Sequence, residues 1–300
     1  MKRFHSERGQ AFVVTVMAIV VLLGMAALVL DVGSWYRDKR GLQAIADSAA
    51  LAGAQALPEN PAQAADLAAQ YAQTNGGPAP QVSFSSKYLP NDTINVKMSR
   101  SAPGFFAKVF SVDSVSIVSK AAARTGGLGA AQYAAPFGID QREPMLQCKP
   151  DPCSDQTTLD LQKVGPGAFR ILNLDNSKGG SGQQILAQWI AQGFAGLMPV
   201  NTDYYSDSGA KFNASEVKAA MNDAVATGRE LLFPVYSAVD GTGSNVQYTV
   251  IGWAGFIVDK FSGNGNTGSI TGHFTRFIAQ GLQGTGGTPT YGAYTVQLVD

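Results

Sequence analysis

The sequence is poor in the side chains that most often build metal and catalytic centres. Its 300 residues include only two histidines, His5 and His273, and two cysteines, which leaves little for zinc chemistry. Charged residues make up 15% of the chain and the formal net charge is zero, which argues against nucleic acid or another polyanion as a partner. We therefore expect no cofactor, no metal and no nucleic-acid partner.

Motifs for catalysis are also lacking. There is no Gly-x-Ser-x-Gly elbow, and His273 lies in a strand-like run, where a structural role is expected. Residues 177–184, SKGGSGQQ, resemble a phosphate-binding loop but lack the Gly-Lys-Ser/Thr that such a loop needs. We interpret them as a turn before a helix and expect a non-enzymatic protein.

The chain does contain one long apolar run, at residues 11–30. It has no charged residue, and Thr15 is its only polar side chain. Twenty helical residues at about 1.5 Å each cross a hydrocarbon core of about 30 Å. Trp35 and Tyr36 follow the run, where amphipathic rings favour the headgroup layer. The sequence predicts a single N-terminal membrane span.

The helical pattern continues beyond the span as a stem. Pro58 is expected to end it, so that residues 1–57 form a transmembrane and stem helix. One side of the stem is a narrow apolar seam of mostly small residues, which allows another helix to approach closely. The seam consists of Leu42, Ile45, Ala49, Ala52 and Ala56. We expect a partner protein to pack there.

Residues 58–125 are predicted to form a small α+β unit. Asn60 and Pro61 are an N-cap and first-turn residue for a second helix, which Asn75 and two glycines end near Thr74. Alternating apolar residues then indicate a strand at 94–98, with a second strand at 114–118 and a possible third at 81–85. A short helix between the first two carries Phe105, Phe106, Val109 and Phe110, and we expect its aromatic side chains to pack on the sheet.

A Gly/Ala-rich connector, 126–136, is predicted to lead to a larger α+β domain at 137–300. Its expected elements are a strand at 169–174, a helix at 183–192, a helix opened by a capping box at 213–216, and an antiparallel sheet over 231–237, 246–258, 269–278 and 294–299. The fold class is thus α+β: a membrane helix extended into a stem, a strand–helix–strand unit, and a mixed body with an antiparallel C-terminal sheet.

The end of the span and the start of the stem carry a recognisable motif. Residues 30–57 read LDVGSWYRDKRGLQAIADSAALAGAQAL, and this block resembles the N-terminal region of TadE/TadG-like Flp pilus-assembly proteins. The resemblance is dense over residues 8–57. The positions that carry it most clearly are Asp31, Gly33, Tyr36, Gln43, Asp47 and Gly53.

The resemblance implies a membrane-anchored component of a Tad/Flp pilus or related secretion apparatus. Its body would be a docking or assembly module, and its partners the bilayer and other apparatus proteins, in a homo- or hetero-oligomer. Two alternatives stay open: a membrane-tethered exported binding protein for a small ligand or matrix component, and a tethered hydrolase. A deep apolar pocket in 137–300 would favour the binding protein.

The side of the membrane is not set by charge, because three basic residues flank each end of the span. The very short N-terminal tail favours a cytoplasmic N-terminus in the inner membrane, with residues 31–300 exported to the periplasm. Cys148 and Cys153 lie close together in a Pro-rich loop without metal partners, which suits an oxidising compartment. We predict a disulfide between them.

Overall fold

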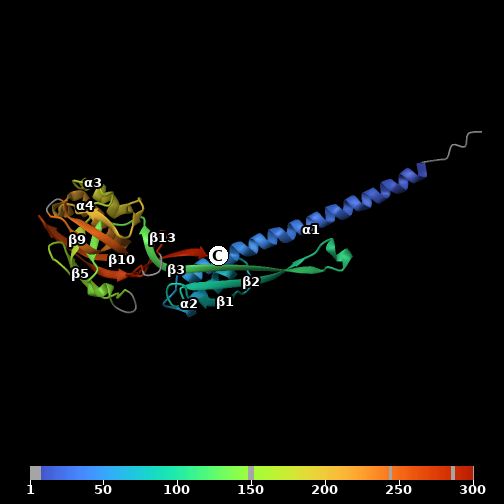
Figure 1. Ribbon diagram of the computed structural model, residues 1–300, viewed down its shortest axis with the longest axis horizontal. Helices are drawn as coiled ribbons and strands as arrows, with labels where there is room; N and C mark the ends of the chain where they lie inside the picture. Colours follow the sequence, from blue (N-terminus) through green and yellow to red (C-terminus); the bar gives the residue numbers. More distant parts are fainter. Residues whose placement is uncertain (1–7, 148–151, 243–244, 285–287, 300) are drawn as a thin grey trace, which may run out of the picture.

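The molecule is an elongated body at the end of a long helix. The computed structural model describes residues 8–147, 152–242, 245–284 and 288–299. One end of helix α1 projects freely, and its other end lies along a narrow sheet that leads to a compact second sheet (Figure 1). We call the narrow sheet with its helices the stalk, and the second sheet with its helices the head. The predicted α+β class is confirmed.

The stalk is built mainly from the first part of the chain. Its elements are α1 (Arg8–Ala54), α2 (Pro61–Thr74), β1 (Gln81–Ser85), β2 (Thr93–Pro103), the 3₁₀ helix η1 (Ala107–Phe110), β3 (Ser114–Ala131), β7 (Met198–Pro199), β12 (Phe277–Ile278), β13 (Gly281–Gln283) and β14 (Ala293–Val299).

The head follows in the chain. Its elements are β4 (Phe137–Asp140), η2 (Pro144–Leu146), β5 (Gln156–Asp160), β6 (Phe169–Ile171), α3 (Gln183–Gln192), β8 (Thr202–Tyr205), η3 (Gly209–Asn213), α4 (Ser215–Thr227), β9 (Glu230–Asp240), β10 (Gln247–Asn264) and β11 (Thr267–Thr275).

Helix α1 combines the predicted span and stem without a break. It is long and apolar enough to cross a membrane, and its most apolar window is not covered by any other part of the protein. A bare apolar helix of this length is not the core helix of a water-soluble fold, because such a helix would be covered. α1 is therefore a single-pass membrane anchor. It ends at Ala54, shortly before Pro58.

The stalk sheet has the order β1-β2-β3-β14-β12. β2 and β3 form a long antiparallel hairpin whose register runs from Thr93 opposite Arg124 to Pro103 opposite Ser114. The hairpin lies beside α1, and α2 packs on the same helix (Figure 1). Apolar side chains from β2, chiefly Ile94, Val96 and Met98, fill the space between sheet and helices. The helix from Pro61 to Thr74, capped by Asn60, is as predicted.

Two expectations about the stalk are wrong. The residues expected as a connector, 126–136, are largely strand, because β3 continues to Ala131. The last strand, β14, was expected in the C-terminal sheet, but it pairs with β3 in the stalk, with Tyr294 opposite Gly127 and Val299 opposite Ala122. Both differences have one cause: backbone pairing partners distant in sequence leave no mark on the local pattern of either strand.

The packing of the apolar side chains at the turn of the hairpin also differs from expectation. They were predicted to pack on the sheet, but the hairpin extends beyond the core of the sheet, so these side chains are not covered by it. Phe105, Phe106, Val109 and Phe110 are all exposed. Amphipathic periodicity locates an apolar face but does not show what covers it.

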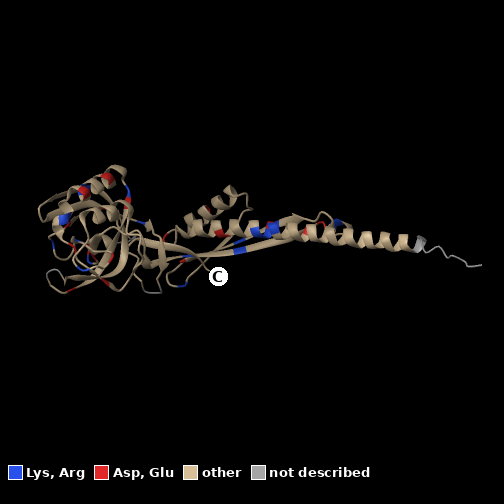
Figure 2. Ribbon diagram, turned by 90° about the horizontal axis from the view of Figure 1, so that it is seen from above, with Lys and Arg blue, Asp and Glu red and all other residues tan. Residues whose placement is uncertain are grey.

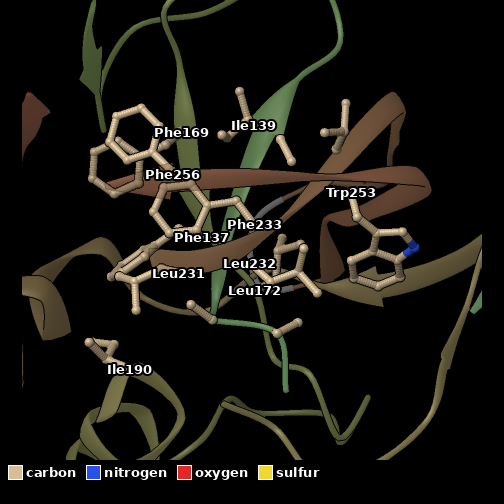
Figure 3. Close-up of a cluster of buried hydrophobic side chains, with 14 of the residues drawn as sticks. Phe137, Ile139, Phe169, Leu172, Ile190, Leu231, Leu232, Phe233, Trp253 and Phe256 are labelled. Atoms are coloured by element: carbon tan, nitrogen blue, oxygen red, sulfur yellow. The ribbon is translucent and has the colours of Figure 1, made fainter. Parts of the chain in front are cut away.

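The head sheet has the order β5-β11-β10-β9-β4-β6, with β8 also paired to β10. Aromatic rings form its core: Phe137 meets Phe169 and Phe233 edge to face, at centroid distances of 5.7 and 5.4 Å (Figure 3). Helix α3 has the bounds predicted, and α4 lies where expected. The capping box at 213–216 is wrong, because the side chain of Asn213 donates to Gly265 and Thr267 instead.

Arg276 joins the head to the stalk. Its guanidinium donates to the carbonyls of Gln55, at 2.8 Å, and Leu57, just past the end of α1. It also pairs with Glu59 and lies 4.4 Å from the ring centroid of Tyr294 in β14. Burial lowers the pKa of Arg276, although a guanidinium keeps its charge near neutral pH. One side chain thus connects the head, the helix end and the last strand.

We predict that Arg276→Gln frees the turn between α1 and α2. A charged hydrogen bond contributes about 1.5–3 kcal/mol, so local opening should increase about tenfold or more. A glutamate-specific protease should cleave after Glu59 correspondingly faster in the full chain held in detergent micelles. Arg142→Gln is the control, because Arg142 pairs with Asp140 inside the head. Equal cleavage of the Arg276 variant and the wild type would contradict the role given to Arg276.

Candidate functional site

The candidate site is the contact between α1 and the stalk sheet, where the motif residues predicted from the sequence lie. Four of the six, Asp31, Gln43, Asp47 and Gly53, face the sheet or α2 and are described first. The other two, Gly33 and Tyr36, face away from the sheet.

Asp31 holds the turn of the β2–β3 hairpin. Its side chain is 1% exposed, and its carboxylate accepts the backbone N–H groups of Phe105, Phe106 and Ala107, with Phe105 at 3.0 Å. Nearby, Trp35 Nε1 donates to the carbonyl of Pro103 at 2.9 Å. A carboxylate that accepts several backbone N–H groups forms strong charge-assisted hydrogen bonds. Asp31 therefore fixes the hairpin turn to α1 at the residue where the apolar run ends.

Gln43 and Asp47 tie the middle of the stem to β3. Gln43 Nε2 donates to Asp47 Oδ1 and to the carbonyl of Lys120, both at 2.8 Å. Lys39, one turn earlier, donates to the carbonyl of Val118. These bonds occupy β3 carbonyls along the side that meets α1, so they set the register of the helix against the hairpin.

Gly53 is required by close packing. A Cβ at this position would lie 2.5 Å from Ile94 Cδ1 and 2.7 Å from the carbonyl oxygen of Ala64. Real Cβ atoms do not approach this closely, so α1, α2 and β2 meet where only glycine fits. Gly33 differs, because no other atom lies within 4 Å of the position its Cβ would take.

The seam of small residues is buried within the chain itself. Leu42, Ala49, Ala52 and Ala56 are covered, and Ile45 is partly covered, by α2 and the stalk sheet. The expectation that another protein packs on this seam is corrected: the helix that approaches closely is α2, through Ala64, Ala68 and Ala72. A sequence pattern shows that a close-packed face exists, but it does not distinguish a partner in the same chain from one in another.

Tyr36 points away from the stalk. Its ring is exposed, and the guanidinium of Arg40 lies 5.6 Å from its centroid. An exposed amphipathic ring just beyond the apolar run is typical of a residue that lies in the headgroup layer.

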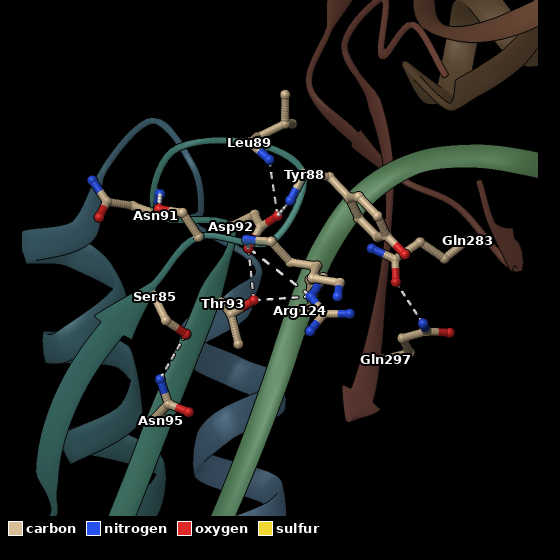
Figure 4. A network of polar contacts seen from close by, with 12 residues as sticks. Ser85, Tyr88, Leu89, Asn91, Asp92, Thr93, Asn95, Arg124, Gln283 and Gln297 are labelled. Carbon is tan, nitrogen blue, oxygen red and sulfur yellow. Dashed lines mark hydrogen bonds and ion pairs between the residues drawn. The ribbon is translucent and has the colours of Figure 1, made fainter. Parts of the chain in front are cut away.

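A second aspartate, missed in the sequence, holds the other end of the hairpin. The buried carboxylate of Asp92 accepts the backbone N–H groups of Lys87, Tyr88 and Leu89, at 2.6–2.9 Å, and the hydroxyl of Thr93 (Figure 4). Arg124 of β3 lies 4.0 Å away. A short polar loop before a strand gives little sign of such a network, although Asp in a turn is a known signal for local N–H binding.

The titration of Asp92 follows from these contacts. Burial alone would raise the pKa of the Asp92 carboxyl, but the hydrogen bonds from Thr93 and the three backbone groups outweigh it and lower the pKa below 3.8. Because the folded pKa is below the unfolded one, Asp92 stabilises the fold above pH 3.8, and this contribution is lost as the pH falls through the folded value.

An open groove of about 730 Å³ runs along the stalk beside the motif residues. Gln43, Asp47, Lys97 and Lys120 contribute polar side chains to it, and Leu298 of β14 contributes an apolar one. The groove joins residues of α1, β1, β2, β3 and β14. It is an open groove on the stalk with both polar and apolar side chains in its lining, and it is not the deep apolar pocket in 137–300 that would favour a small-ligand binding protein.

The residues of the head that were candidates for ligand binding or catalysis make structural contacts. The backbone N–H of Ser181, in the loop that resembles a phosphate loop, donates to the buried carboxylate of Asp207 at 2.7 Å, and Lys211 pairs with the same carboxylate. An internal anion thus occupies the position a phosphate would need. His273 Nδ1 lies 3.5 Å from Asp259. Among the described residues, no group of three or more potential ligands could hold a metal ion.

The predicted disulfide cannot be placed. Cys148 lies outside the described residues, whereas Cys153 is among them, and its backbone N–H donates to the carbonyl of Met145 at 3.2 Å. The pairing of the two cysteines stays a prediction.

We predict that Gly53→Ala destabilises the stalk by about 1–3 kcal/mol, because the added methyl forces α1 away from Ile94 and Ala64. Gly41→Ala is the matched control: it lies on the exposed side of the same helix with no atom near its Cβ position, and it should stabilise the helix by up to about 1 kcal/mol. Hydrogen exchange of the amides at 42–56, measured on the full chain in micelles, reports both. Unchanged protection in the Gly53 variant would show that the close approach is absent.

Comparison with known proteins agrees with the motif residues. No curated protein and no solved structure matches the chain. A family model does match, and its range, 9–56, covers the membrane span and the stem up to the turn after α1. Residues 9–56 of this chain are thus recognised as the region described as putative Flp pilus-assembly TadE/G-like, as the resemblance at Asp31, Gln43 and Gly53 indicated.

Proposed function

We propose that the chain is a non-enzymatic, membrane-anchored component of a Tad/Flp pilus-assembly or secretion apparatus, and that its head is the docking module. This proposal rests on the agreement between two residue ranges, that of the family match and that of helix α1. The family match, 9–56, is also the segment that forms the anchor and the helical side of the stalk. Two of the residues that mark the family, Asp31 and Gly53, hold α1 against the hairpin.

The geometry supports a spacer. From Asp31 to Ala54, α1 continues for 24 residues, or about 35 Å at 1.5 Å per residue, with the sheet packed along it. A helix braced on one side by a sheet cannot bend freely, so the stalk holds the head at a fixed distance from the membrane (Figure 1). Because α2 and the sheet cover the seam, apparatus proteins would contact the head, the outer side of the stalk or the bare span.

Disruption of the gene should abolish or strongly reduce surface pili, counted by electron microscopy, and the full chain should restore them. A variant in which a cleavable signal peptide replaces residues 1–30 should be exported but should not restore pili, because the head would no longer be held at the membrane. Normal piliation in the disrupted strain, or full rescue by the released variant, would contradict the proposed role.

We further propose that the anchor lies in the inner membrane, with the N-terminus in the cytoplasm and residues 31–300 in the periplasm. The close cysteine pair, which suits an oxidising compartment, supports this orientation. Protease added to spheroplasts should degrade the head and leave a small membrane-protected N-terminal fragment. Protection of the whole body would reverse the orientation and would leave Cys148 and Cys153 in a compartment that keeps thiols reduced.

A further inference from the structure

The turn of the β2–β3 hairpin presents a cluster of apolar side chains that the protein does not cover. We call residues 104–113 the hairpin tip; the backbone N–H of Gly104 closes it by donating to Asp113 at 2.9 Å. Three phenylalanines and a valine are exposed there: Phe105, Phe106, Val109 and Phe110, with Val109 83% exposed. Single exposed apolar residues are ordinary, but a contiguous group of this size marks a contact surface.

The position of the hairpin tip relative to the bilayer follows from its contacts. Asp31, which holds the backbone of Phe105, Phe106 and Ala107, is the first residue after the apolar run 11–30. Trp35, one turn later, bonds to Pro103. The tip is therefore fixed to α1 at the residue where the helix leaves the hydrocarbon, and it cannot lie far from the membrane surface (Figure 1).

The distribution of charge agrees with this position. The projecting half of α1 carries no charged side chain over residues 11–30, and charged residues begin where the hairpin tip lies beside the helix (Figure 2). Both signs occur there: Arg37, Lys39 and Arg40 follow Asp31 on α1, and Asp38 lies among them. The tip adds Lys108 from η1 and Asp113 at its end. Basic side chains at this level favour the anionic headgroups of a bilayer.

We propose that the hairpin tip inserts Phe105, Phe106, Val109 and Phe110 into the interfacial layer of the same bilayer that α1 spans. Apolar side chains on a short element next to basic residues are typical of interfacial membrane contacts. The occupant of this surface is lipid, because the surface continues directly from the bare span, which lipid covers. The bilayer then holds the protein at two places, the span of α1 and the hairpin tip. These two contacts fix the tilt of the stalk relative to the membrane. The proposal depends on the membrane anchor alone and not on the role in pilus assembly.

The test compares two valines of nearly equal exposure. Val109 in the tip is 83% exposed and Val164 in the head is 84% exposed. Each is changed to cysteine in a Cys148→Ser, Cys153→Ser background, labelled with a nitroxide, and placed as the full chain, one copy per disc, in nanodiscs of phosphatidylcholine and phosphatidylglycerol. Power-saturation EPR then measures the access of O₂, which concentrates in lipid, and of Ni-EDDA, which stays in water.

The label at Val109→Cys should show an O₂ to Ni-EDDA access ratio several-fold above that at Val164→Cys. Equal ratios at the two positions would place the tip in water and overturn the proposal. Low access of both reagents at Val109→Cys would indicate a protein contact, and so would a change that appears only in discs with two or more copies. Either of these results would also overturn it.

Discussion

The structure depends on the close packing of one helix face against a sheet. α1 presents small side chains over two and a half turns of its stem, and at Gly53 there is room for no side chain at all. This packing holds α2 and the β2–β3 hairpin on the anchor helix. The hydrogen bonds of Gln43 and Arg276 form between elements that this packing holds together. The helix that carries the apolar run thus continues without a break into a folded core.

Two aspartates extend this packing to the ends of the hairpin. Asp31 binds the turn nearest the membrane and Asp92 binds the loop nearest the head, each through three consecutive backbone N–H groups. Loop backbone groups that would otherwise need water are satisfied by a buried charge. The hairpin is thus fixed along its length by side-chain packing and at its ends by ionised carboxylates, which makes the stalk a rigid unit.

Local sequence patterns were sufficient for the helices and most strands, because each of these is determined by its own periodicity and caps. The span at 11–30, the helix capped by Asn60 and the helix at 183–192 all follow from such patterns. The motif residues of the site could also be found, since Asp31 and Gly53 belong to a recognisable block. Their contacts could not be found from the sequence, because the residues they meet are distant from them in the chain. Asp31 contacts Phe105, and Gly53 contacts Ile94.

The errors share this cause. The seam at Ala49 was assigned to another protein, the aromatic residues of the tip to the sheet, and β14 to the head. In each case the sequence shows that a side chain or strand needs a partner and does not show which partner it takes. Pairings between distant residues depend on the whole fold, and a single strand such as Ala293–Val299 can complete either of two sheets with the same alternation of side chains.

The pairing of β14 with β3 gives the chain an unusual topology. The stalk sheet opens with β1, β2 and β3 and is completed by β12, β13 and β14, so the head is largely an insertion between strands of the stalk, with β7 pairing back to β3 from within it. β3 ends at Ala131, and the returning chain pairs with it at Gly281, opposite Ala131, so the two ends of the insertion lie side by side. An insertion whose ends lie side by side can be exchanged without disturbing its host. The same anchored stalk can therefore carry heads of other shapes, provided that each returns the chain to β3 as a closing strand.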